Sequence, residues 1–265
     1  MNLTRLLLMF LTATICTSVA SRGDADETWR KLPLVLDGQL ADGWKHAGFG
    51  KLVVDGDAVR TECDERGLGL VVWTKEKLGD CQIRVVFRTK DARSNAGVIV
   101  RLDEGVLDWV GKDSPAVKRD QAGKLSPEML ARMQEASEKE QGAWYAVHHG
   151  YEVQICDTGD AVHRTGAVYS LAPAAEAPKP ATAEKGQPAW RTMIITLDGN
   201  VVRVEVDGKP LTEFDPASKE VPPRKAWYEP KREPRRPQAG YIGLQTHDPG
   251  DVVWFKELSV RPLRK

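Results

Sequence analysis

Alternation of apolar and polar residues along the chain predicts β-strands rather than helices. The clearest example is residues 150–157, where Tyr, Val and Ile alternate with Glu152 and Gln154. Successive side chains of a strand point to opposite faces, so this strand has one apolar face and one face with a carboxylate and an amide. Residues 95–101 and 241–247 show the same two-faced pattern.

The polar faces of these three strands supply a set of candidate site residues. If the strands lie in one sheet, five of these polar side chains converge on one surface: Arg101, Glu152, Gln154, Gln245 and His247. The alternative is the ordinary wet face of an antiparallel sheet. Solvated faces usually carry Lys, Thr and Ser, whereas two Gln, a Glu, an Arg and a His beside glycines favour a site for a polar ligand.

The rest of the pattern predicts an all-β fold with one helical insertion. Short strand-like runs recur, and Asp-Gly turns at 55–56 and 198–199 indicate hairpins. Residues 102–149 interrupt this rhythm, because Ser126-Pro127 is a typical helix start and apolar residues follow at helical spacing to about residue 141. We expect a two-sheet antiparallel β-sandwich, or jelly roll, in residues 32–265. The helix lies in an inserted loop, either as a lid or as a passive surface element.

Composition and the N-terminus narrow the choice of partners and location. The 265 residues include 38 Lys and Arg and 38 Asp and Glu, so the charge gives no support for nucleic acid or an anionic membrane as partner. Residues 1–20 have the positive start, short apolar run and small residues of a secretory signal peptide, too short for a membrane span. We therefore expect a secreted or periplasmic protein, with residues 21–31 as a flexible leader.

Three cysteines, Cys63, Cys81 and Cys156, remain after removal of the signal peptide. An odd number leaves at least one thiol unpaired within the chain. Cys63 and Cys81 flank a predicted hairpin and can form a disulfide in an oxidising compartment. The alternative is that both are ordinary buried thiols. No cysteine spacing suggests zinc.

Five motifs in order carry a resemblance to a known family. They are Leu36-Asp37-Gly38 with Gly43-Trp44, Ser94-Asn95-Ala96-Gly97-Val98 with Arg101, Gly150-Tyr151-Glu152-Val153-Gln154-Ile155, Thr165-Gly166-Ala167-Val168-Tyr169, and Gly240-Tyr241-Ile242-Gly243-Leu244-Gln245-Thr246-His247 followed by a strand ending in Arg261-Pro262-Leu263. With these the chain resembles the 3-keto-disaccharide hydrolase family, which is abundant in secreted bacterial proteins. The resemblance implies a concanavalin A-like sandwich whose concave face binds sugar. The chain differs from the family pattern at residues 102–149 and 172–188, which are longer than usual in the family, and at residues 255–257.

The chemistry that the resemblance implies needs a base and an acid. A sugar oxidised at carbon 3 has an acidified proton at carbon 2, and its removal gives an enolate that expels the glycosidic oxygen before water adds. Glu152 is the candidate base or acid, and Arg101 the candidate clamp for the enolate or a hydroxyl, paired with Glu152 in the empty site. His247 is the second proton-transfer candidate, because imidazole titrates near neutral pH.

Five further residues are candidate ligands of the sugar: Gln154, Gln245, Asn95, Asp157 and His163. The last two are second-rank candidates on a loop after the Glu152 strand, and they can also hold a divalent metal. A loop Asp commonly just caps a turn. No other cofactor is predicted, and carbohydrate is the expected partner.

A non-catalytic carbohydrate-binding module is the alternative function. Trp44, Trp73, Trp144 and Tyr169 are possible sugar platforms in that case, although core packing is expected for most of the tryptophans. An ordinary two-carboxylate glycosidase is disfavoured, since Glu152 has no obvious carboxylate partner in the motifs.

Overall fold

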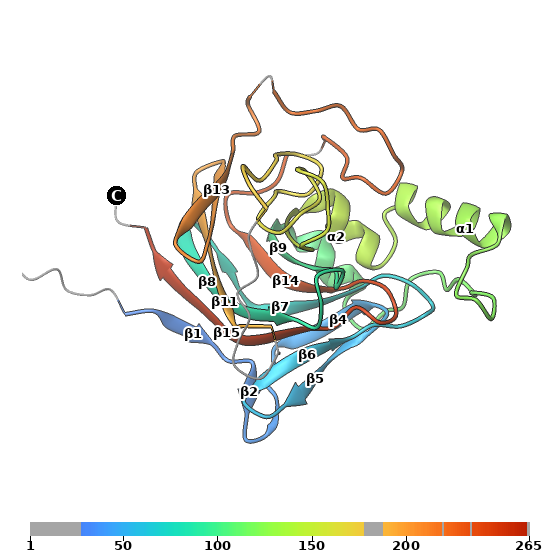
Figure 1. Ribbon diagram of the computed structural model, residues 1–265, viewed down its shortest axis with the longest axis horizontal. Coiled ribbons are helices and arrows are strands. Elements are labelled where there is room, and N and C mark those ends of the chain that lie inside the picture. Colours follow the sequence, from blue (N-terminus) through green and yellow to red (C-terminus); the bar gives the residue numbers. More distant parts are fainter. Residues whose placement is uncertain (1–27, 178–187, 219, 234, 264–265) are drawn as a thin grey trace, which may run out of the picture.

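Two antiparallel sheets packed face to face form the body of the protein in the computed structural model, which describes residues 28–177, 188–218, 220–233 and 235–263 (Figure 1). The larger sheet has the order β13-β12-β11-β8-β15-β6-β5, with β1 paired to β15. Its strands are β1 Arg30–Leu32, β5 Lys51–Asp55, β6 Ala58–Glu62, β8 Cys81–Thr89, β11 Arg191–Asp198, β12 Val201–Val206, β13 Lys209–Phe214 and β15 Val253–Pro262.

The second sheet has five strands in the order β10-β9-β14-β7-β4. They are β4 Trp44–Gly48, β7 Gly69–Leu78, β9 Ala96–Leu102, β10 Tyr151–Ile155 and β14 Gly240–Thr246. A small hairpin, β2 Val35–Leu36 with β3 Gln39–Leu40, lies outside both sheets. The antiparallel two-sheet sandwich predicted from the alternating pattern is confirmed.

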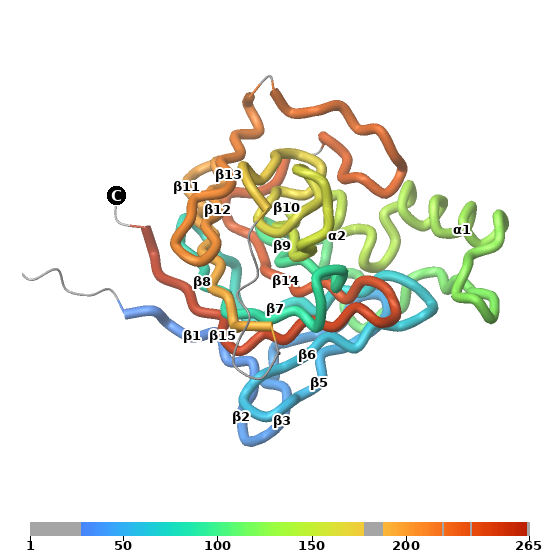
Figure 2. The backbone as a smooth tube through the Cα atoms, viewed as in Figure 1, coloured from blue at the N-terminus to red at the C-terminus, as the bar shows by residue number. Residues whose placement is uncertain are grey.

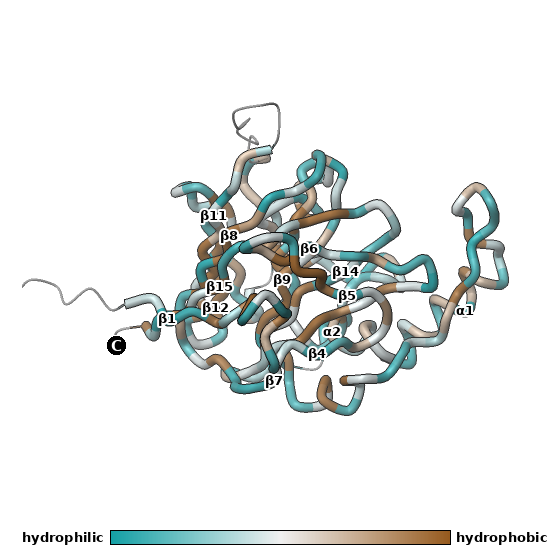
Figure 3. Tube along the Cα trace, turned by 90° about the horizontal axis from the view of Figure 1, so that it is seen from below, coloured by the Kyte–Doolittle hydropathy of each residue, from teal (hydrophilic) through white to brown (hydrophobic). Residues whose placement is uncertain are grey.

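The core lies between the two sheets and follows the predicted alternation. In β8, Ile83, Val85 and Phe87 are buried and the residues between them are half-exposed. They pack in one cluster with Val98 and Ile242 of the five-stranded sheet. Apolar segments accordingly gather in the interior and hydrophilic ones on the outer loops (Figure 3). Full burial of each such side chain contributes roughly 1.5–3 kcal/mol to folding.

Three adjacent strands of the five-stranded sheet are buried on both faces, whereas an ordinary sheet with a solvated face is buried on one face only. Every residue of β9, β10 and β14 is buried. On the outer face, helix α2, Ala143–His149, packs with the 3-10 helix η1, Glu104–Trp109, over Leu70, Val72 and Ile99. The polar residues of these strands therefore face a covered space rather than bulk water.

The predicted helix of the insertion is α1, Pro127–Glu138, and it projects from the sandwich (Figures 1 and 2). Its start is the expected one, because the Ser126 hydroxyl accepts a hydrogen bond from the Met129 backbone nitrogen at 3.2 Å. The insertion also contains α2 and η1, which the sequence pattern did not predict.

Other local predictions need correction. The predicted leader, residues 21–31, already enters the sheet, since β1 begins at Arg30 opposite Val260. The predicted signal peptide, residues 1–20, lies outside the described residues. The family motif at residues 165–169 is a series of turns with isolated bridges.

The cysteines are free thiols and no bridge links Cys63 to Cys81. Burial raises the pKa of both of these thiols to about 11, so they stay protonated. Across the described ranges, the structure has no helix long and apolar enough to cross a membrane.

Candidate active site

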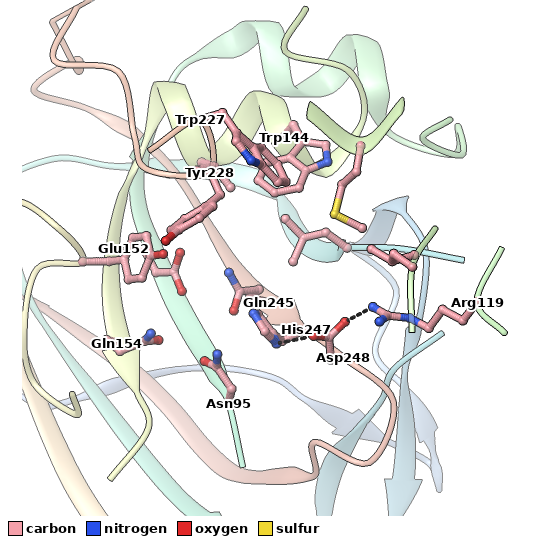
Figure 4. A pocket seen from close by; sticks show the side chains of 15 residues that line it. Asn95, Arg119, Trp144, Glu152, Gln154, Trp227, Tyr228, Gln245, His247 and Asp248 are labelled. Atoms are coloured by element: carbon pink, nitrogen blue, oxygen red, sulfur yellow. Dashed lines mark hydrogen bonds and ion pairs between the residues drawn. The ribbon is translucent and has the colours of Figure 1, made fainter. Parts of the chain in front are cut away.

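A cavity of about 330 Å³ lies on the outer face of the five-stranded sheet, beside α2. Its floor comes from β9, β10 and β14 and from the residues that flank them (Figure 4). The floor side chains are Asn95, Glu152, Gln154, Gln245 and His247. Four of the five polar residues predicted to converge on one surface therefore line one cavity, together with Asn95, which was predicted as a sugar ligand.

Strand register explains why these side chains meet. Gln154 lies opposite Gly97, and the pairing of Leu244 with Val98 places Gln245 on the other side of the same glycine. A Cβ atom at Gly97 would lie 2.4 Å from Oε1 of Glu152. The glycine therefore leaves the space in which the Glu152 carboxyl group lies between the two amides.

Glu152 is a buried carboxyl group that can exchange a proton near neutral pH. It is 7% exposed. Burial raises its pKa to about 7, although the charge of His247 and a hydrogen bond from Gln245 oppose the rise. A carboxyl group with this pKa is a stronger base than an exposed one and is suited to general acid–base chemistry.

His247 is held in one orientation by Asp251. Its Nδ1 lies 3.0 Å from Oδ2 of Asp251, so Nδ1 donates its proton to the carboxylate and Nε2 remains for a ligand. Burial disfavours the imidazolium, but the hydrogen bond to Asp251 and the charges of Asp248, Asp251 and Glu152 outweigh it and raise the pKa of His247. Each of Glu152 and His247 thus favours the charged form of the other.

Asp251 was not among the predicted site residues. Its Oδ1 accepts a hydrogen bond from the Asn95 backbone nitrogen at 3.0 Å, and its Oδ2 accepts one from the Asp248 backbone nitrogen at 3.2 Å. One carboxylate therefore ties the start of β9 to the turn after β14. The only signal in the sequence is its position four residues after His247.

Two hydrogen-bond acceptors on the cavity floor are available to a ligand. Among the described residues, Oδ1 of Asn95 and Oε1 of Gln245 are buried without a hydrogen-bond partner. A buried polar atom without a partner is destabilising, so these oxygens suit a ligand that brings hydroxyl groups. Gln154 is oriented differently, because its Oε1 accepts a hydrogen bond from the Ile155 backbone nitrogen at 3.1 Å.

The structure does not bring Arg101 to this cavity. Its guanidinium is 3% exposed and binds Asp80 at 3.1 Å and the Gly199 carbonyl at 3.0 Å. The cause is a bulge, because the register of β14 against β9 shifts beside Arg101 and its φ is +58°. A bulge ends the two-residue alternation that the prediction relied on. The expected pairing of Arg101 with Glu152, and with it the enolate clamp, is therefore wrong.

Asp157 and His163 are also away from the cavity lining. The Asp157 carboxylate is buried against Arg191 at 2.8 Å and accepts a hydrogen bond from the Thr165 hydroxyl at 2.6 Å. His163 has Nδ1 2.8 Å from Asp160 and Nε2 2.9 Å from the Ser170 hydroxyl. Asp157 thus ties its loop to β11, His163 bonds within the loop, and neither side chain lines the cavity, so the prediction that they contact the sugar there is wrong. Within the described ranges, no three His, Cys, Asp or Glu side chains form a metal-binding group.

The aromatic candidates divide between the core and the cavity. Trp44 and Trp73 pack on each other in the core, with ring centroids 5.4 Å apart. Trp144 and Tyr169 line the cavity. Burial, with the nearby charge of Glu152, raises the pKa of Tyr169, so its phenol stays protonated and can donate a hydrogen bond.

Eight lining residues were not singled out by the sequence analysis, and four of them carry a charge or an aromatic ring. Trp227 and Tyr228 approach from the segment before β14, and Arg119 pairs with Asp248 at the rim (Figure 4). They lie in irregular segments, where alternation gives no information about which side chains meet.

Known proteins resemble this chain in sequence pattern and in fold. The family model of the 3-keto-alpha-glucoside-1,2-lyase-like domain matches residues 29–261. No curated protein matches the chain significantly. Among solved structures, a candidate glycosyl hydrolase from Parabacteroides distasonis is 19% identical, with 89% of this chain and 100% of that chain covered and a TM-score of 0.54. A Bacillus subtilis protein of unknown function with a galectin-like fold is 14% identical, with 90% and 100% covered and a TM-score of 0.50. These two likenesses show the fold.

Proposed function

The chain belongs to the 3-keto-alpha-glucoside-1,2-lyase-like family, and from this premise we propose that it cleaves 3-keto-glycosides by elimination followed by hydration. The observation that carries the proposal is the buried Glu152, whose pKa is raised to about 7, beside His247 on the floor of one cavity. Two ionisable groups whose pKa values are set by each other and by burial are typical of an acid–base pair. The name of the Parabacteroides distasonis protein also supports a carbohydrate ligand.

In the proposed elimination, ionised Glu152 removes the proton from carbon 2 of the sugar. The electron pair of that bond forms the double bond between carbons 1 and 2 while the bond from carbon 1 to the glycosidic oxygen breaks. The His247 imidazolium donates its Nε2 proton to the departing oxygen, since Nδ1 is bound to Asp251. Because His247 carries the positive charge next to Glu152, it takes over the electrostatic role first expected of Arg101.

Hydration returns the enzyme to its starting state. Water adds to carbon 1 and gives a proton to neutral His247, while protonated Glu152 returns a proton to carbon 2. The unpartnered oxygens of Asn95 and Gln245 accept hydrogen bonds from sugar hydroxyls and so position carbon 2 near Glu152. No step requires a second carboxylate.

The test compares a 3-keto-glucoside with the corresponding ordinary glucoside, in D₂O, with and without a chelator. Elimination predicts that only the keto sugar is cleaved and that the product carries deuterium at carbon 2 beyond the exchange seen without enzyme. The deuterium enters only when the Glu152 proton exchanges with solvent before hydration, so the decisive result is that for the ordinary glucoside: its cleavage at a similar rate would refute the mechanism, because its carbon 2 proton is not acidified. Loss of cleavage with the chelator would show that a divalent metal takes part, which the proposed steps do not include.

Variants separate catalysis from binding. Glu152→Gln should bind the keto sugar but release at least 10²-fold less product, because it removes the base. Glu205→Gln is the matched control, since Glu205 lies on β12 in the other sheet and does not line the cavity. Sugar binding by the unmodified protein with no turnover of either glucoside would favour the carbohydrate-binding module instead.

Export is a separate proposal that rests on residues 1–20 alone. The signal-peptide pattern supports a secreted or periplasmic location. Mass spectrometry of the protein from its native host should show a terminus near residue 21, and an intact Met1 would contradict export by this route.

A further inference from the structure

The cavity has an apolar side opposite its polar floor. We call this side the apolar wall and define it by Met133, Trp144, Val147, Trp227 and Tyr228. The Trp144 and Trp227 rings lie 5.5 Å apart, and the Trp227 and Tyr228 rings 5.4 Å apart in an edge-on arrangement. Figure 4 shows the three aromatic side chains grouped on one side of the cavity and the floor residues on the other.

The apolar wall is held in place before any ligand binds. Trp227 and Tyr228 belong to residues 224–232, which we call the strap. The Ser137 hydroxyl of α1 donates to the Trp227 carbonyl at 2.9 Å, and Nδ1 of His148 in α2 accepts from the Lys231 backbone nitrogen at 3.2 Å. Arg224 adds an ion pair to Glu138 at 3.0 Å. Preorganised aromatic groups bind a ligand without first losing conformational freedom.

Both parts of the apolar wall come from segments that β-strand pairing does not define. Met133, Trp144 and Val147 lie in the insertion, and Trp227 and Tyr228 lie in the strap. The floor, by contrast, comes from residues in or directly flanking the sheet strands. The sugar ring and the group attached to it are therefore contacted by structurally independent parts of the chain.

We propose that the apolar wall binds the leaving group of the substrate and that this leaving group contains an aromatic ring. This inference rests on the proposed function, which assigns the sugar ring to the polar floor. A second sugar can stack one face on Trp144, but its outward hydroxyl groups would then lie against Met133 and Val147, where they lose hydrogen bonds to water. A flat aromatic ring instead buries apolar surface and meets the Trp and Tyr rings in favourable edge or offset geometry.

The test uses substrates whose leaving groups differ in shape but not in chemical reactivity. 2-Phenylethyl and ethyl 3-keto-glucosides both release a simple primary alcohol, so a phenol's better leaving ability does not interfere. We expect kcat/KM for the phenylethyl compound to exceed that of the ethyl compound by about tenfold or more, which is the factor for one well-packed ring. Equal values, or a preference for a 3-keto-disaccharide, would overturn the proposal.

Variants of the apolar wall should remove this preference. Tyr228→Ala is suitable because Tyr228 is 45% exposed and its loss leaves the core intact. Trp227→Leu tests the half-buried ring, and Trp190→Ala is the matched control, because Trp190 stacks with Arg88 and Lys256 and does not line the cavity. The ratio of kcat/KM for the two substrates should fall several-fold in the first two variants and stay unchanged in the control.

A binding measurement keeps this inference separate from the proposed function. Quenching of tryptophan fluorescence by ordinary 2-phenylethyl and ethyl glucosides needs no turnover. If neither keto compound is cleaved but the phenylethyl glucoside binds about tenfold more tightly, the proposed function fails and the aromatic subsite stands. If cleavage occurs and neither kinetics nor binding distinguishes the two compounds, the proposed function stands and the aromatic subsite is refuted.

Discussion

Replacement of Glu152 by glutamine should make the protein more stable at alkaline pH. The Glu152 pKa rises from 4.5 to about 7 in the folded protein, chiefly because of burial. Each pKa unit corresponds to ~1.4 kcal/mol, so the ionised carboxylate destabilises the fold by about 3 kcal/mol relative to a neutral group. Neutral glutamine has nearly the same shape and has no charge to bury.

The sign of the pH dependence follows from proton linkage. Between pH 4.5 and about 7 the folded state keeps the Glu152 proton that the unfolded state has released, so the free energy of unfolding falls as pH rises. Above pH 7 this loss is complete. The stability of Glu152→Gln minus that of the unmodified protein should therefore be near zero at pH 4.5 and grow to about 3 kcal/mol above pH 8.

The assay is urea denaturation at a series of pH values from 4.5 to 9 for the unmodified protein and both variants. His247 titrates in all of them, and in Glu152→Gln it lacks the nearby Glu152 charge, so the difference curve reports Glu152 together with its interaction with His247. Glu205→Gln is again the control for the substitution itself, because Glu205 lies in the other sheet and does not line the cavity. A flat difference for Glu152→Gln would refute the reasoning, because it would mean that the carboxylate has no excess proton affinity in the folded state.

Three further predictions concern the residues that position the site. Arg101→Ala breaks a buried ion pair and should lower the free energy of unfolding by about 3–5 kcal/mol. KM of the folded enzyme should stay unchanged, and a raised KM would show that Arg101 contacts the substrate. Gly97→Ala should displace the Glu152 carboxyl group and reduce kcat by about 10²-fold with little loss of stability, and an unaltered kcat in steady-state assays would contradict this. Asp251→Asn removes the hydrogen-bonded carboxylate that raises the pKa of His247, so the alkaline limb of the pH profile of kcat/KM should move to lower pH, and an unmoved limb would rule out His247 as the acid.

Strand alternation was sufficient to predict most of the site. The period of two is a local property of the backbone, so it places Glu152 and Gln154 on one face whatever the rest of the chain does. The same holds for Gln245 and His247. The sandwich itself follows from many such strands, and the start of α1 follows from Ser126 and the proline after it. These predictions succeeded because each depends on neighbouring residues alone.

The remaining features depended on contacts between distant segments. A bulge in the pairing of β9 with β14 turned Arg101 away from Glu152 toward Asp80, and nothing in the local pattern signals it. The cover formed by α2 and the strap changed an apparently wet sheet face into the floor of a cavity. Only that cover removes water from Glu152 and raises its pKa, because desolvation is a property of the folded surroundings and not of the residue's position in the sequence.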